Sequence, residues 1–284
     1  MGKKEKKDQF IIAYLTDLDK TDAIINNAIC FAKMLDKGLI LLHISDKEYT
    51  KISTQEAEQK LIELSSKITE IPFCSYFAVE GKSKEILHKA SELLSGVLLV
   101  SSSNSDKPDN KKQKLANYTK ELFKNLYESR VAYFIIDQNQ AHPLPFDKVI
   151  MTINNMRESK EKVLWGSYFG RFSKSEIIVY YHNYKDEFHR HQLHYNIKFL
   201  MKMFDGFKIN YKLHLSSNPK TYVDYQAIQH AREISAGLVI CQTTKDKDWT
   251  NKIFGLKELK TLEGNLDIPI LFVNPRNDLF ILCE

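Results

Sequence analysis

The sequence carries the same pattern twice, at a spacing of 137 to 141 residues. In each copy, a glycine followed by four apolar residues comes directly after an amphipathic stretch. Three apolar segments recur in the same order: residues 40–43 as 179–182, 96–100 as 237–241, and 131–136 as 268–273. A period this long is a whole domain rather than a solenoid repeat. The chain is therefore predicted to be a tandem duplication of one domain.

The repeat divides the chain into a first domain over residues 1–139 and a second over 146–284, joined by a linker at 140–145. Pro143 and Pro145 favour a loop at this boundary, because proline supports neither a helix interior nor a central strand. Each half is long enough to bury a core of its own. Residues 1–8 are predicted to be a basic, solvated tail because they lack apolar side chains.

Charge and cysteine content exclude several classes of protein. The 41 basic and 36 acidic residues give a net charge of only +5, which is not the footprint of a nucleic-acid-binding surface. No apolar run approaches the length of a membrane span, and no signal peptide is expected at the start of the sequence. The four cysteines have no metal-binding or disulfide spacing, so we expect a cytoplasmic protein with reduced thiols.

Apolar runs of strand length alternate with amphipathic stretches of helical period along both halves. Continuous apolar strands alternating with helices predict an α/β fold, in which a doubly wound parallel sheet is covered on both faces. The predicted strands are 10–15, 39–44, 73–79, 97–100, 132–136, 148–153, 176–181, 208–215, 238–241 and 268–273. The predicted helices are 23–35, 56–68, 84–94, 118–127, 159–171, 188–204, 223–235 and 256–263.

With these elements placed, the chain resembles a tandem universal stress protein. The segments that carry the resemblance are Phe10–Asp17, Ala28–His43, Val79–Gly81, Gly96–Val100 and Val131–Ile136, with looser matches at Ala227–Cys241 and Ile268–Val273. The resemblance implies two tandem domains of the adenine nucleotide alpha hydrolase-like type, each with a five-stranded parallel sheet. It also implies that the domains pair through their last strands as a pseudo-dimer, and a homodimer of the whole chain is a further expectation.

ATP-binding members of this family place an acidic residue after the first strand and a glycine-rich loop after the fourth. In this sequence Thr16 or Asp17 takes the acidic position, and Ser101, Ser102 and Ser103 begin a loop without glycine. Only the hydroxyl of Thr119 corresponds to the end of the loop motif in the first half, and only Gly255 in the second. Because glycine lets backbone amides approach phosphates, family-type ATP binding is not expected.

Three functions are compatible with these sequence features. The first is a non-catalytic cytoplasmic protein of stress response or signalling, which has no cofactor and acts through unknown protein partners. The second is a sensor that binds a nucleotide such as ATP or AMP, or another anion, at the first-domain switch point, through Asp17, Ser101–Ser103 and Thr119. An enzyme ranks third, because no catalytic motif is present.

Two further groups of residues are open to two interpretations. His189, His191 and His194 could ligate a metal from one helix, but no carboxylate or cysteine follows at ligand spacing, and an exposed helix start explains them better. Gly166 and Gly170 could face a ligand, whereas close packing of their helix on the sheet is the simpler interpretation.

Overall fold

The computed structural model describes residues 9–103, 129–137, 146–216, 223–243 and 268–274. The described residues up to Tyr133 form one compact unit, and those from Phe134 onward form a second, so that strand β5 (Ala132–Asp137) spans the division. The predicted tail 1–8, the linker 140–145 and the helices at 118–127 and 256–263 lie outside the described residues.

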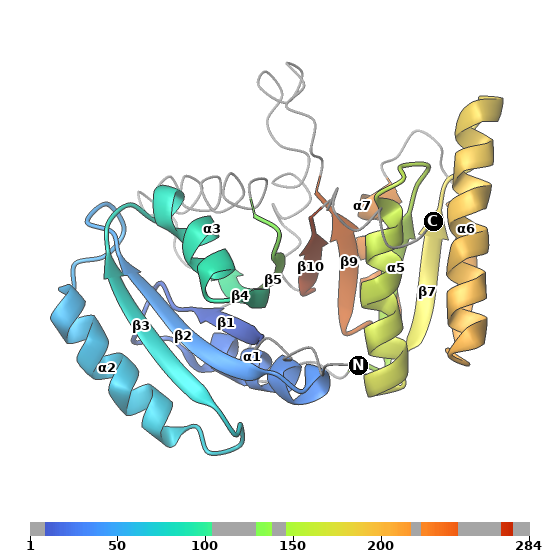
Figure 1. Cartoon of the computed structure of the whole chain (residues 1–284). Helices are drawn as coiled ribbons and strands as arrows, with labels where there is room; N and C mark the ends of the chain where they lie inside the picture. Colours follow the sequence, from blue (N-terminus) through green and yellow to red (C-terminus); the bar gives the residue numbers. More distant parts are fainter. Residues whose placement is uncertain (1–8, 104–128, 138–145, 217–222, 244–267, 275–284) are drawn as a thin grey trace, which may run out of the picture. The chain divides into compact units, whose positions relative to one another are not determined.

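The first unit alternates strands and helices, and each predicted element in its described part is present. In chain order the elements are β1 (Phe10–Tyr14), α1 (Asp22–Leu35), β2 (Gly38–Ser45), α2 (Thr54–Lys67), β3 (Cys74–Glu80), α3 (Ser83–Leu93) and β4 (Gly96–Ser103). All pairings among β1, β2, β3 and β4 are parallel, in the order β3-β2-β1-β4. Figure 1 shows α1 and α2 on one face of this sheet and α3 on the other, which is the doubly wound arrangement.

The second unit repeats this plan. Its elements are β6 (Lys148–Ile153), α5 (Ser159–Tyr168), the π-helix η1 (Phe169–Ser173), β7 (Glu176–Tyr181), α6 (Glu187–Gly206), β8 (Tyr211–Leu215), α7 (Val223–Glu233), β9 (Leu238–Gln242) and β10 (Ile270–Val273). The strand order is β10-β9-β6-β7-β8, with parallel pairs throughout. In this unit α5 and α6 cover one face and α7 the other (Figure 1).

Continuous apolar strands explain the cores of both units. Every residue of β2 after Gly38 is buried, as is every residue of β10, because helices cover both faces of a parallel sheet. The α/β fold class predicted from the sequence is thus confirmed. Helix starts are fixed locally: Ser53 and Glu56 form a capping box at α2, and the Asp186 side chain accepts a hydrogen bond from the His189 N–H at α6.

Most boundaries within the described residues agree with the prediction to within two residues, and three differ by more. The fourth strand continues through Ser101, Ser102 and Ser103, so these serines lie at the end of β4 rather than in a loop. A serine is small enough to lie in a buried strand, although runs of serine usually indicate a loop. The predicted helix 159–171 divides into α5 and η1, and β8 begins at Tyr211 rather than at residue 208.

Within the described residues, no helix combines the length and the hydropathy needed to span a bilayer.

Candidate functional site

The sheet of the first unit brings two of the predicted site segments together. β1 pairs in parallel with β2 on one side and with β4 on the other, so the strand order reverses at β1 while all strands keep the same direction. Ala13 pairs with Val100, which places Ser101 and Ser102 beside Tyr14 and Leu15. Thr16 and Asp17 directly follow Leu15 in the sequence. We call Thr16, Asp17, His43, Ser45 and Ser101–Ser103 the first carboxyl edge, since all lie at or just beyond the carboxyl ends of β1, β2 and β4.

Two hydroxyl groups at the end of β4 are buried and have no hydrogen-bond partner among the described atoms. Ser101 is fully buried and Ser102 is 1% exposed, and neither Oγ has a partner among the described atoms. A buried polar group without a partner costs about 1–3 kcal/mol, so native structures keep such groups for water, an ion or a ligand. The two hydroxyls are therefore available to a ligand that reaches the end of β4.

His43 adds an unused acceptor to the same edge. Its Nδ1–H donates to the Leu15 carbonyl oxygen over 2.7 Å, which leaves the lone pair on Nε2. Burial lowers the pKa of the His43 imidazole, and the bond to Leu15 offsets this only in part, so the ring is neutral at pH 7. Within the described part of the chain, Nε2 has no partner, and neither has the Oγ of buried Ser45 at the end of the same strand. Sequence reasoning missed His43 because it stands inside an apolar run and no local motif marks it.

The acidic groups near this edge differ in their availability. The Asp17 carboxylate is half-buried and accepts a hydrogen bond from the Asp19 N–H over 3.0 Å. Asp46 is buried, and both of its carboxylate oxygens accept a hydrogen bond, one from the Ser83 N–H at the start of α3 over 2.7 Å and one from the Glu48 N–H over 3.1 Å. Asp17, which is less buried, therefore has the larger acceptor capacity for a ligand.

At the carboxyl edge of the second unit, the polar side chains form hydrogen bonds within the unit itself. The Ser159 hydroxyl bonds to the Asn154 side chain, and Asn196 Nδ2 donates to the Asn154 and Met156 carbonyl oxygens over 2.9 and 2.7 Å. The Thr243 hydroxyl donates to Asn274 over 2.8 Å. Among the described atoms of this edge, only Gln242 Oε1 is buried without a partner. The two units therefore differ, and open polar groups are concentrated in the first.

A lysine lies inside the second unit at this edge. Lys162 is 1% exposed, and its Nζ donates to the Thr152 hydroxyl over 3.2 Å. Burial lowers the pKa of the Lys162 ammonium, and the negative charge of Asp224 counteracts this shift only in part. The sequence does contain a signal for this position, because residue 162 lies on the α5 face that also holds Ser159, Val163 and Gly166, all of which are buried.

Other predicted site residues are placed as follows. Thr119 and Gly255 lie outside the described residues, and nothing is described of the Ser103 side chain. His189 Nδ1 contacts Asp186 at 3.1 Å, and His191 Nε2 contacts Glu187 at 3.6 Å, both on the exposed start of α6. No group of three or more metal-ligating side chains is present within the described part of the chain.

Comparison with known proteins gives a fold and no close relative. A universal stress protein from Archaeoglobus fulgidus DSM 4304 matches with a TM-score of 0.71 at 13% identity, over 95% of this chain and 97% of that one. A putative universal stress protein from Pseudomonas aeruginosa UCBPP-PA14 matches with a TM-score of 0.64 at 13% identity, over 97% and 96%. A functionally unknown protein from Pseudomonas aeruginosa PAO1 matches with a TM-score of 0.61 at 11% identity, over 97% of this chain and 95% of that one.

No protein-family model and no curated protein sequence matches this chain. The similarity to the solved structures nevertheless extends over nearly the full length of each. The fold is therefore that of the universal stress proteins, as the sequence resemblance predicts, and at these identities the similarity establishes the fold alone.

Proposed function

We propose that this protein is a non-catalytic, cytoplasmic protein of stress response and signalling whose first unit senses a nucleoside-type ligand. The observation that carries the proposal is the set of four buried atoms without a partner among the described residues of the first carboxyl edge: His43 Nε2 and the hydroxyl oxygens of Ser45, Ser101 and Ser102. In an open α/β sheet, ligands bind beyond the carboxyl ends of the strands, at the point where the strand order reverses.

The chemistry of these groups favours a neutral, donor-rich ligand over a triphosphate. His43 Nε2 and the Asp17 carboxylate accept hydrogen bonds, and the amine and ribose hydroxyls of a nucleoside donate them. The segment from Ser101 to Lys114 contains no glycine with which backbone amides could surround a phosphate. We therefore expect adenosine and AMP to bind at least as tightly as ATP.

Titration calorimetry with adenosine, AMP, ADP and ATP tests this proposal. The Ser102→Ala variant is expected to lose about tenfold in affinity, which corresponds to one hydrogen bond of about 1.4 kcal/mol. Its melting temperature is expected to stay the same or to rise, since the removed hydroxyl has no partner among the described atoms of the free protein. The control is Ser167→Ala, because Ser167 is also buried but donates to the Leu164 carbonyl oxygen in the second unit.

Different results would contradict different parts of the proposal. Much tighter binding of ATP than of adenosine would show that a phosphate site exists, and turnover of ATP would show that the protein is an enzyme. A folded, ligand-free sample that releases no heat with any of the four compounds would remove the sensor function.

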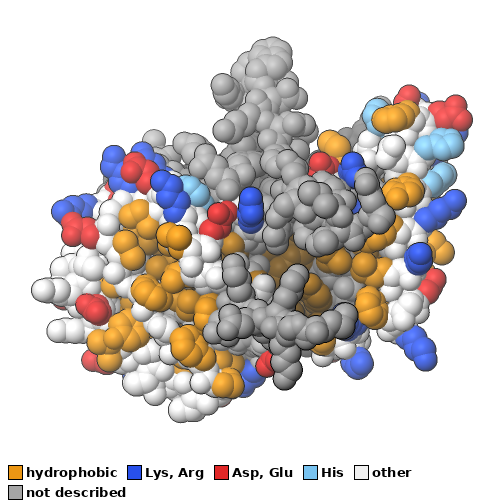
Figure 2. Space-filling view, viewed as in Figure 1, with side chains coloured by type: hydrophobic (Ala, Val, Ile, Leu, Met, Phe, Trp, Pro, Cys, Tyr) orange, Lys and Arg blue, Asp and Glu red, His pale blue; other side chains and the backbone are white. Residues whose placement is uncertain are grey.

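A scaffold that acts through protein partners is the second candidate. Hydrophobic side chains gather on the face of the first unit where β2, β3 and α3 lie (Figure 2). In these elements Phe77 is 43% exposed and Leu93 is 84% exposed, whereas large apolar side chains are normally covered. Partner binding by the Phe77→Ser, Leu93→Ser double variant, compared with the parent protein, distinguishes this function from ligand sensing. Pairing of the two halves as a pseudo-dimer, and a homodimer of the whole chain, remain predictions.

A further inference from the structure

A pocket lies in the second unit, away from its carboxyl edge. It has a volume of about 460 Å³ and is lined by Lys148, Glu176, Ile178, Lys212, His214 and His230, together with apolar side chains named below. Lys148 and Glu176 are the first residues of β6 and β7, and Lys212 is the second residue of β8. We call this the amino-end pocket. It lies beside α7, which packs on β6, β7 and β9, and beside β8, whose residues after Tyr211 are exposed.

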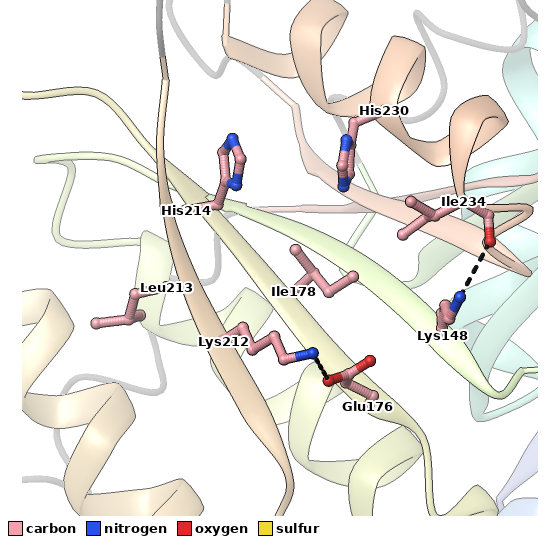
Figure 3. A pocket seen from close by; sticks show the side chains of 8 residues that line it. All are labelled: Lys148, Glu176, Ile178, Lys212, Leu213, His214, His230 and Ile234. Atoms are coloured by element: carbon pink, nitrogen blue, oxygen red, sulfur yellow. Dashed lines mark hydrogen bonds and ion pairs between the residues drawn. The ribbon is translucent and has the colours of Figure 1, made fainter.

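Positive charge exceeds negative charge in the lining of the amino-end pocket, since two lysines face one carboxylate. Lys212 Nζ contacts that carboxylate, on Glu176, at 2.7 Å, so these two charges offset each other. Lys148 Nζ instead donates to the Ile234 carbonyl oxygen, over 3.4 Å (Figure 3). A hydrogen bond of this length to a carbonyl oxygen is weak, so the Lys148 ammonium has donor capacity left for an anion.

Two imidazoles from different elements face each other at the pocket. The rings of His214 on β8 and His230 on α7 have centroids 5.4 Å apart, and both rings contact Tyr180, at 4.3 and 5.5 Å (Figure 3 shows the two histidines). His230 Nδ1 contacts Glu233, which is 72% exposed and does not line the pocket. Burial and the neighbouring His230 both lower the pKa of His214, and an anion between the rings would reverse this effect.

The remaining wall is apolar. Ile178, Leu213 and Ile234 line the pocket beside the charged groups, and Ile178 is 8% exposed. A site of this size with apolar walls and a few convergent polar groups is typical of a small-molecule pocket. The volume suits a single aromatic ring or a short alkyl chain carrying one charged group.

We propose that the amino-end pocket binds a small organic anion, whose charged group contacts Lys148, His214 and His230 and whose apolar body packs on Ile178 and Ile234. This site is separate from the first carboxyl edge and stands independently of the nucleoside proposal. Because neutral imidazoles become cationic donors at lower pH, binding is expected to tighten as the pH falls.

Benzenesulfonate is the probe that tests this site, because its charge stays constant across the relevant pH range. Imidazole signals of the full-length ¹⁵N-labelled chain are followed by NMR, with His214→Asn and His230→Asn providing the assignments. We expect saturable shifts of both signals and at least about fivefold tighter binding at pH 5.5 than at pH 7.5, with weaker responses to sulfate and to benzyl alcohol.

Lys148→Met is expected to weaken binding about tenfold, and His191→Asn, on exposed α6, is expected to leave it unchanged. Unchanged thermal melts confirm that each variant is folded, which is expected because Lys148 and His191 are exposed. The proposal is overturned by the absence of saturable shifts at pH 5.5, by equal responses to benzenesulfonate and sulfate, or by equal losses in the two variants.

Discussion

Replacing Lys162 with methionine is expected to raise the free energy of unfolding by up to about 3 kcal/mol at pH 7. Lys162 is 1% exposed, and its Nζ donates to one neutral partner, the Thr152 hydroxyl at 3.2 Å. Substituting a buried charged group by an apolar side chain of similar length is often stabilising by about 1–4 kcal/mol. Loss of the bond to Thr152 subtracts about 1 kcal/mol from this gain. Denaturant unfolding of the variant and the parent protein measures the difference.

The pH dependence provides a second readout of the same residue. Burial lowers the pKa of Lys162 in the folded protein, so the unfolded chain binds a proton that the folded chain gives up more readily. The stability contributed by Lys162 therefore rises with pH, up to the ordinary lysine pKa of about 10.4. The advantage of the methionine variant should be fully present below the folded-state pKa of Lys162 and should shrink as the pH rises to about 10.

Lys198→Met is the matched control, because Lys198 lies on α6 with its side chain exposed. This variant should change the free energy of unfolding by less than about 0.5 kcal/mol and should not alter its pH dependence. If Lys162→Met instead destabilised the protein at pH 7, the ammonium would be held by more than Thr152. Asp224, whose charge favours the protonated form, would be the first residue to examine.

The strands were predictable because their burial comes from their own composition. Residues 39–44 are apolar except for His43, and the structure extends this segment by one residue at each end to give β2. A parallel sheet covered on both faces requires such runs, so length and apolarity suffice to find them. The serines after Val100 were wrongly predicted to begin a loop, although they belong to β4. Burial of a hydroxyl at a strand end depends on neighbouring strands, which the local sequence does not reveal.

The candidate site was only partly predictable for the same reason. Thr16 and Asp17 were predicted because the first strand ends there, and the parallel pairing of β1 with β4 places them at the same edge of the sheet as the end of β4. His43 and Lys162 were not found. His43 is defined as a site residue by its bond to Leu15 on the adjacent strand, and Lys162 by its burial against the sheet. The role of His43 becomes apparent only when the tertiary contacts are known, whereas the place of Lys162 on the buried face of its helix could have been inferred from the sequence.

Replacing Gly170 with alanine is expected to destabilise the second unit by about 1–3 kcal/mol. Gly170 lies in η1, and a Cβ added there would overlap Cγ2 of Ile209 and lie 2.9 Å from its Cγ1. These atoms are next to the backbone of a β-branched side chain, so they cannot move away by a change at the end of the chain. Ile209 is buried, and its N–H donates to the Phe204 carbonyl oxygen over 2.9 Å, which holds its backbone in place. Overpacking of this kind outweighs the gain in helix propensity from alanine.

Gly206→Ala and a double-mutant cycle make this prediction specific. Gly206 ends α6, and no described atom lies within 4 Å of an added Cβ, so alanine there should be neutral or stabilising by up to about 1 kcal/mol. Ile209→Ala alone should destabilise through a cavity, but it also removes the atoms that an alanine at residue 170 would meet. Gly170→Ala should therefore cost less in the Ile209→Ala background than in the parent protein. Equal costs in both backgrounds would show that Gly170 is required for its backbone conformation rather than for its close contact with Ile209.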